Sequence, residues 1–326
     1  MSSWLLKTAV QHVFKGLPRT QWWNGLMQQH LTGGLRLQPY GEFQAKLKAC
    51  RRHLQFYQSW SRKPRDNFSV VEIGTGWFPI IPIGLHLCGA GEILTYDIVR
   101  LLRPDTLGMV VEYLCLFART GELYEILPEA RPEPVSQLMR LARSPVDRSP
   151  VEFLKRLNIQ AIIGNVCNLR SDNGSVDLVY SHGVLEHLAP PLLAQAMAEF
   201  RRVCGWSSVM SHFIGMADQF SSFDKSITPF NNLRYSARAW RWLDSPIIPQ
   251  NRLRVSDYIH NYSTAGFETV AREDVNGAES DLAKVRTAPE FARYSRDELL
   301  ALYSWLIARP VEASGHLVSV LTDSSL

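Results

Sequence analysis

Short apolar segments that alternate with helical patterns are the feature that most constrains the fold of this chain. Five of them predict buried strands, because each is brief, rich in β-branched residues and bounded by glycine or turn residues. Helices are predicted between the first two segments, at 80–88, and after the fourth, at 190–204. Strands separated by helices indicate an α/β fold whose mostly parallel sheet is covered on both faces. The five segments are 68–74, 91–98, 159–166, 175–182 and 207–216.

Long stretches outside this pattern predict additions to the core. Residues 1–66 carry apolar side chains at helical spacing, among them Phe43 and Leu47, and predict a helical N-terminal extension. The remainder, 67–326, is predicted to be one domain with two insertions.

The first insertion is expected at about 99–158, a stretch that is too long for one crossover and looks helical apart from a loop at 128–134. The second, at about 215–262, is rich in aromatic residues and arginine and is expected on the substrate side. Two late strands are predicted at 266–270 and 314–323.

Composition narrows the class of protein. The chain has 326 residues, of which 46% are hydrophobic and 20% charged, as in folded globular proteins. A net charge of +4 is too small to indicate a nucleic-acid surface. The five cysteines are scattered without a C-x-x-C pair, which argues against disulfides and zinc and indicates a reducing, cytoplasmic location.

No segment has the composition of a signal peptide or the length of a transmembrane helix, so no membrane span is expected. The histidines and cysteines are scattered without ligand spacing, so no metal is expected either. Basic residues in 50–65 leave peripheral membrane contact open, and the oligomeric state stays open as well.

The loop after the first strand, "EIGTGWFP", indicates which ligand the sheet binds. Gly74 and Gly76 allow positive φ and close approach of the backbone to a ligand. A dinucleotide fingerprint requires a third glycine at position 79, where this chain has Pro79, and an apolar residue in place of Glu72. A carboxylate at that position favours a ligand that carries an ammonium group.

A second acidic residue, Asp97, ends the second strand, where a carboxylate accepts hydrogen bonds from the ribose hydroxyls of a nucleoside. A ligand with an ammonium group at one end and a ribose at the other is S-adenosylmethionine.

The stretches "VVEIGTGWFPIIP", "ILTYDI", "IIGNV" and "VDLVYSHGVLEHL" resemble the successive motifs of the class I S-adenosylmethionine-dependent methyltransferases over about residues 68–214. The resemblance implies a Rossmann-like, seven-stranded sheet and a set of cofactor residues, with "VLEHL" resembling the small-molecule branch. Phe78 stands at the family's third glycine, and Asn165 replaces a frequent acid. The implied cofactor residues are Glu72, Gly74, Thr75 and Gly76 at the methionine end, Asp97 and Ile98 near the ribose, Asn165 and Val166 beside the adenine, and Ser181 and His182 at the mouth of the site.

Methyl transfer from a sulfonium requires alignment of the acceptor and, for a hydroxyl or a protonated amine, a base. His182 and His212 are the catalytic candidates, although a packing or capping role stays open for both. Asp218, Arg252 and Arg254 are candidates for holding the acceptor, and surface ion pairs are the alternative for the arginines. His187, near a helix start, is expected to be structural.

The sequence therefore predicts a methyltransferase that acts on an oxygen or nitrogen atom of a small molecule, such as a metabolite, a sugar, a natural product or a lipid-linked compound. Two alternatives stay open at this point. One is an NAD(P)-dependent oxidoreductase on a similar fold, and the other is a catalytically silent, cofactor-binding partner subunit.

Overall fold

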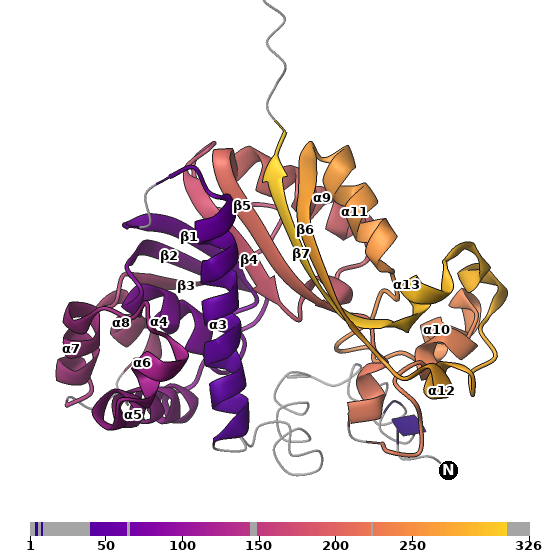
Figure 1. Ribbon diagram of the computed structural model, residues 1–326, viewed down its shortest axis with the longest axis horizontal. Coiled ribbons are helices and arrows are strands. Elements are labelled where there is room, and N and C mark those ends of the chain that lie inside the picture. Colours follow the sequence, from indigo (N-terminus) through magenta and orange to yellow (C-terminus); the bar gives the residue numbers. More distant parts are fainter. Residues whose placement is uncertain are drawn as a thin grey trace, which may run out of the picture.

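A seven-stranded sheet forms the centre of the structure. The computed structural model describes residues 4, 5, 8, 40–63, 66–143, 149–222 and 224–311. The strands lie in the order β3-β2-β1-β4-β5-β7-β6 (Figure 1). They are β1 (Phe68–Ile73), β2 (Ala90–Asp97), β3 (Ile159–Ile163), β4 (Val176–His182), β5 (Cys204–Gly215), β6 (Phe267–Asn276) and β7 (Ala301–Pro310).

Most of the sheet is parallel. β1 pairs in parallel with β2 and with β4, while β3 and β5 add in parallel at either side. Only the far edge differs, because β7 runs antiparallel to both β5 and β6. The order of the strands reverses between β1 and β4, and in open α/β sheets this reversal opens a crevice at the carboxyl ends of the strands. The expected mostly parallel sheet is confirmed.

Helices cover both faces of the sheet (Figure 1). On one face, α3 and the helices that follow β1 and β2 pack on alternate strand residues such as Val70 and Leu178. On the other face, α9 and α11 pack on the intervening residues, such as Val71 and Val179. The helices are α3 (Gly41–Trp60), α4 (Ile80–Leu87), α5 (Pro104–Thr120), α6 (Glu122–Ile126), α7 (Pro132–Leu141), α8 (Pro150–Lys155), α9 (Pro190–Val203), α10 (Ala237–Leu243), α11 (Val255–Thr264), α12 (Glu279–Leu282) and α13 (Arg296–Leu300).

A smaller lobe lies beyond the β6–β7 edge and contains α10, α12 and α13 (Figure 1). Its core joins Phe230 and Leu233, from the segment after β5, to Leu282 and Phe291, from the segment between β6 and β7. The second of these segments is an addition to the sheet that the sequence analysis does not predict.

The other predicted elements compare closely with the structure. The five core strands, the strand near 266–270 and the helices near 80–88 and 190–204 are confirmed within a few residues. The loop predicted at 128–134 is wrong in part, since α7 begins at Pro132, whose fixed φ suits the first turn of a helix. The structure has β7 at Ala301–Pro310, which was not predicted, while the strand predicted at 314–323 lies outside the described residues.

Candidate functional site

A cavity of about 570 Å³ opens where the order of the strands reverses. Its walls come from the loop after β1, the ends of β2 and β4, the segment after β3 and two segments farther along the chain. Such a volume is typical of a site for a small ligand. Nine of the residues predicted to bind the cofactor line it: Glu72, Gly74, Thr75, Gly76, Asp97, Ile98, Asn165, Val166 and His182.

The loop between β1 and α4 needs both of its glycines. Gly74 has φ +90°, and a Cβ there would lie 2.4 Å from a methyl carbon of Val184. Gly76 has φ +62°, and a Cβ there would meet nothing within 4 Å. Positive φ disfavours other residues at both positions, and the bare Gly76 backbone leaves room for a ligand beside it. α4 begins directly after Pro79. Pro82 is compatible with this helix because it lies in the first turn, where a missing N–H costs no helical hydrogen bond.

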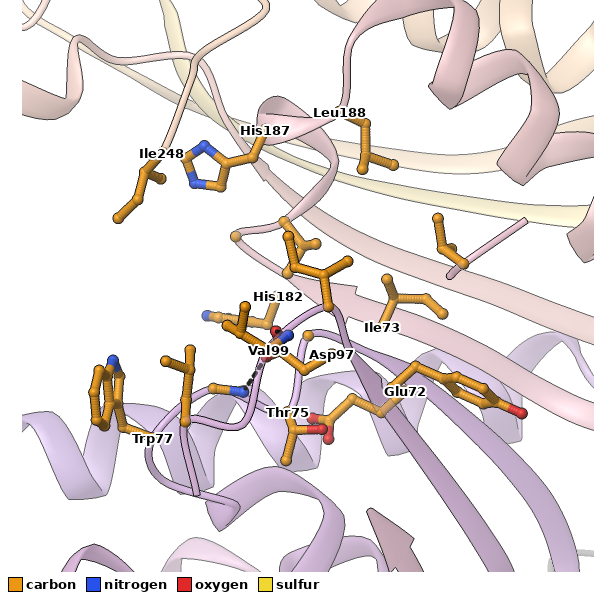
Figure 2. Close-up of a pocket in the computed structure, with 18 of the residues that line it drawn as sticks. Glu72, Ile73, Thr75, Trp77, Asp97, Val99, His182, His187, Leu188 and Ile248 are labelled. Atoms are coloured by element: carbon orange, nitrogen blue, oxygen red, sulfur yellow. Dashed lines mark hydrogen bonds between the residues drawn. The ribbon is translucent and has the colours of Figure 1, made fainter. Parts of the chain in front are cut away.

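Asp97, at the end of β2, connects that strand to the glycine loop. Its Oδ2 accepts a hydrogen bond from the Gly76 N–H at 3.0 Å, and its Oδ1 accepts one from the Val99 N–H at 3.3 Å (Figure 2). Burial raises the pKa of Asp97, although these backbone hydrogen bonds oppose the shift. Each carboxylate oxygen keeps a further lone pair for a ligand hydroxyl.

Glu72 is a buried carboxylate that neighbouring strands hold in place. Its Oε1 accepts a hydrogen bond from the hydroxyl of Tyr180 on β4 at 2.7 Å, and its Oε2 accepts one from Thr95 on β2 at 2.5 Å. Burial raises the pKa of Glu72 to about 7, because a desolvated carboxylate prefers to be neutral. A cationic group brought into the cavity would therefore stabilise its charged form.

The wall opposite the glycine loop comes from a distant segment. Ile247, Ile248 and Pro249 line the cavity together with His187 and Leu188, and Figure 2 shows His187 and Ile248 across the cavity from Trp77 and Asp97. The Nδ1 of His187 lies 2.8 Å from the carbonyl oxygen of Pro249. A carbonyl only accepts, so Nδ1 carries the proton, and the neutral ring keeps an unprotonated Nε2.

His182 also lines the cavity, but aromatic rings surround it. Its ring stacks on Phe213 with 4.6 Å between centroids, and the rings of His53 and Trp305 meet it edge-on. Burial lowers the pKa of His182 to about 3, and the charge of Lys46 adds to this shift. The ring is therefore neutral at physiological pH and a weak base.

Ser181 and His212 do not line the cavity. They lie on the opposite face of the sheet, where the Oγ of Ser181 and the Nδ1 of His212 are 2.8 Å apart and both side chains are fully buried. His212 packs on Phe200 and Tyr262, and burial lowers its pKa to about 3. This placement does not support a catalytic role for His212 or a cofactor contact for the side chain of Ser181.

The three residues predicted to hold the acceptor also lie away from the cavity, and each is engaged within the protein. Asp218 accepts hydrogen bonds from the Asn231 side chain at 2.9 Å and from the Phe220 N–H at 2.8 Å. Arg252 donates to the carbonyls of Asn232 and Tyr235.

Arg254 is 1% exposed and donates to main-chain carbonyls around the start of β7. All three side chains have partners within the protein and none lines the cavity, so this placement does not support the predicted acceptor role, which stays a prediction. The alternative of surface arginines is wrong, since Arg252 and Arg254 are both buried.

Lys46, on α3, is a lining residue that the sequence analysis does not single out. In the sequence, Lys46 lies beside Leu47, which belongs to the apolar stripe of a predicted helix. This position indicates that Lys46 borders a buried face of the helix, but it does not indicate what that face covers. His187 likewise reaches the cavity, although a structural role was expected for it.

A family model described as a methyltransferase domain matches residues 130–205, from α7 through β4 and α9 to the start of β5. The strand order of the sheet and the cavity beside the glycine loop agree with this match. Residues 130–205 thus match a methyltransferase domain, and the seven-stranded sheet has the Rossmann-like fold expected of a class I S-adenosylmethionine-dependent methyltransferase. The cofactor of this chain is S-adenosylmethionine, and the alternative of a nicotinamide oxidoreductase is set aside.

Several solved structures resemble this methyltransferase in shape. A protein from Pyrococcus horikoshii is 14% identical with a TM-score of 0.48, over 90% of this chain and all of the other. An S-adenosylmethionine-dependent methyltransferase from Mesorhizobium loti is 14% identical with a TM-score of 0.42, over 80% of this chain and 95% of the other.

A Haloferax volcanii methyltransferase, in complex with the Trm112 methyltransferase activator, is 13% identical with a TM-score of 0.42, over 85% of this chain and 98% of the other. No curated protein matches the sequence.

Membrane-spanning helices and metal clusters are both absent from the part of this methyltransferase that the structure describes. None of the helices in this part of the chain combines the length and the apolar character that a membrane crossing requires. Within the same residues, no group of three or more His, Cys, Asp or Glu side chains is placed to hold a metal ion.

Proposed function

We propose that this methyltransferase transfers the methyl group of S-adenosylmethionine to an oxygen or nitrogen atom of a small molecule, such as a metabolite, a sugar, a natural product or a lipid-linked compound. The observation that carries the proposal is the segment of Ile247, Ile248 and Pro249, which lines the cavity opposite the glycine loop. An acceptor must enter between these two walls, and such a space suits a small molecule better than a protein surface or a duplex.

The cofactor residues are proposed from the contacts that the cavity offers. Glu72 lies at the methionine end, where its carboxylate faces the ammonium group, and Asp97 accepts from the ribose hydroxyls. Asn165 and Val166 lie beside the adenine. Ile98 is 75% exposed although it lines the cavity, and an adenine ring packed on it would remove this large apolar side chain from water. S-adenosylmethionine itself supplies a methyl group that its sulfonium already activates.

His187 is the base that we propose for an acceptor hydroxyl or amine. Its Nδ1–H is held by the Pro249 carbonyl, so the free Nε2 lone pair can take the proton of the acceptor. Burial lowers the pKa of His187, and its hydrogen bond with Pro249 opposes the shift. His182 is a poorer candidate, because burial lowers its pKa to about 3 and aromatic rings enclose it, and we propose it as an aromatic wall of the site.

The domain organisation predicted from the sequence, an extension followed by a domain with two insertions, also stays a proposal. In it α3, on one face, and the segment after β5, opposite the glycine loop, both contribute to the enclosure of the acceptor. A cytoplasmic location is proposed from the five cysteines, all of which are unpaired and four of which are buried.

Binding of S-adenosylhomocysteine should weaken roughly eightfold between pH 7.5 and pH 6, because the ionised fraction of a carboxyl with a pKa of about 7 falls by that factor. The pKa of Glu72 in the free, folded protein is raised from its ordinary value of 4.5 to about 7. Ionisation of Glu72 with rising pH therefore lowers the stability of the folded protein, because the unfolded chain ionises more easily. The ligand ammonium offsets that cost and binds only the ionised form. Isothermal titration across this pH range measures the effect.

Two controls separate Glu72 from the other titrating groups of the cavity, Asp97, Lys46 and the histidines. Glu72→Gln should bind S-adenosylhomocysteine more weakly and without this pH dependence. 5′-Methylthioadenosine, which lacks the amino-acid group, should bind the unchanged protein equally at both pH values. A pH dependence that persists in Glu72→Gln would refute the assignment.

The proposed function is tested by incubating the pure protein with methyl-labelled S-adenosylmethionine and a cell extract separated into small-molecule, protein and nucleic-acid fractions. We expect label in the small-molecule fraction, and loss of that label in His187→Gln and Glu72→Gln. Label in the protein or nucleic-acid fraction would contradict a small-molecule acceptor. Transfer only after a second protein is added would favour the partner-subunit alternative.

A further inference from the structure

Lys46 extends from α3 into the cofactor cavity. Phe43, Leu47, Cys50 and Leu54 are at most 1% exposed and form the buried stripe by which α3 packs into the core on this face of the sheet. The first turns of α3 lie at the edge of the sheet where the parallel strands end (Figure 1). Lys46 stands in these turns at the border of the stripe, so its half-buried side chain faces the site and not the bulk solvent.

Lys46 and Glu72 reach the same end of the cavity. Side chains alternate between the two faces of a strand, so Glu72 points to the face on which Val70 packs, and this is the face that α3 covers. The electrostatic influence of Lys46 on Glu72, and of Glu72 on Lys46, is consistent with this placement. Within the described residues, however, the ammonium of Lys46 forms no hydrogen bond or salt bridge with any partner.

Glu72 and Lys46 are held by different elements, β1 and α3. Tyr180 and Thr95 each donate to one oxygen of the Glu72 carboxylate, which fixes its position on the sheet. Lys46 lies on a different element and is partly removed from water, which lowers its pKa because the charged form loses hydration. A lysine in this condition is stabilised by an anion that a ligand brings into the cavity.

We propose that Lys46 binds the α-carboxylate of the methionine end of S-adenosylmethionine, while Glu72 binds its α-ammonium. A zwitterionic amino-acid group presents these two charges side by side, which matches a fixed carboxylate and a lysine at one end of the cavity. The proposal rests on the placement of the methionine end beside Glu72 given under the proposed function. It makes Lys46 a specificity-determining residue, since nucleosides without the carboxylate lose its contribution.

The test compares S-adenosylmethionine with decarboxylated S-adenosylmethionine, which keeps the sulfonium and the ammonium but lacks the carboxylate. Isothermal titration is carried out on the full chain, its Lys46→Met variant and the matched control Lys48→Met, which changes an exposed lysine on the same helix. Lys46→Met should weaken binding of S-adenosylmethionine by about tenfold or more, as expected for a lost charge-assisted hydrogen bond. The decarboxylated ligand should bind Lys46→Met and the unchanged protein within about twofold, and Lys48→Met should alter neither affinity.

Two further variants sharpen the result. Lys46→Arg keeps the positive charge and should recover most of the affinity for S-adenosylmethionine. Glu72→Gln should weaken both ligands, because both carry the ammonium. Thermal melting of each variant confirms that it is folded.

Different failures point to different errors. An equal loss for both ligands in Lys46→Met would overturn the carboxylate contact, and so would an unchanged affinity for S-adenosylmethionine, which would leave Lys46 to an anionic acceptor. If the unchanged protein bound neither these ligands nor 5′-methylthioadenosine, the cofactor site itself would be refuted, and the role of Lys46 with it. If it bound all three but did not distinguish the carboxylate, only the role of Lys46 would be refuted.

Discussion

Replacing Arg254 with methionine should reduce the free energy of unfolding by about 3–5 kcal/mol, the size expected when a buried hydrogen-bond network is broken. The guanidinium donates to the carbonyls of Met216, Glu298, Leu299 and Ala301. Methionine fills much of the same volume but donates to none of them, so several buried carbonyls lose their partners. Urea denaturation of the two proteins measures the difference.

The control for this substitution is Arg293→Met. The side chain of Arg293 is 64% exposed and pairs with Asp257, so its removal should cost less than about 1 kcal/mol. If Arg254 held the acceptor, its replacement would leave stability unchanged and weaken acceptor binding alone. That outcome would support the predicted role of Arg254 in holding the acceptor.

The fold could be predicted largely because parallel strands are buried on both faces. Such strands appear in the sequence as short β-branched runs, and the polar residues at their ends fall at the edge where ligands bind. Glu72 and Asp97 could be predicted as residues of the cavity for this reason, since each ends or nearly ends such a run.

The face to which each side chain points could not be predicted. His182 and Ser181 are neighbours at the end of β4, but His182 reaches the cavity and Ser181 lies on the opposite face with His212. The alternation of side chains along a strand is visible in the sequence, whereas the face that carries the site depends on how α3 and α9 pack. His212 was a candidate because its strand ends at the correct edge, but its side chain lies on the opposite face of the sheet, beside Ser181.

β7 was missed for a different reason. Its sequence, "ALYSWLIARP", follows α13 without an intervening loop and contains leucine and alanine, which favour helices. Its strand conformation depends on antiparallel pairing with β5 and β6, which lie far from it in the sequence. Lys46 and His187 reach the cavity through similar long-range packing, so local patterns could not identify them as lining residues.

Asp97→Ala should weaken binding of S-adenosylhomocysteine by about a hundredfold or more, since two charge-assisted hydrogen bonds to the ribose hydroxyls contribute about 3 kcal/mol together. The substitution also frees the Gly76 N–H, which Asp97 holds at 3.0 Å, so the loop that faces the ligand is no longer tied to β2. Isothermal titration measures the affinity, and thermal melting shows that the variant is folded.

Asp97→Asn separates these two effects. Asparagine keeps an amide oxygen for the Gly76 N–H but loses the charge and half of the acceptor capacity, so its affinity should fall between those of the unchanged protein and Asp97→Ala. If both variants were equally weak, the charge on the ribose contact would dominate. If Asp97→Ala bound within about threefold of the unchanged protein, the ribose would have to lie elsewhere, and the alignment of the cofactor along β1 and β2 would be wrong.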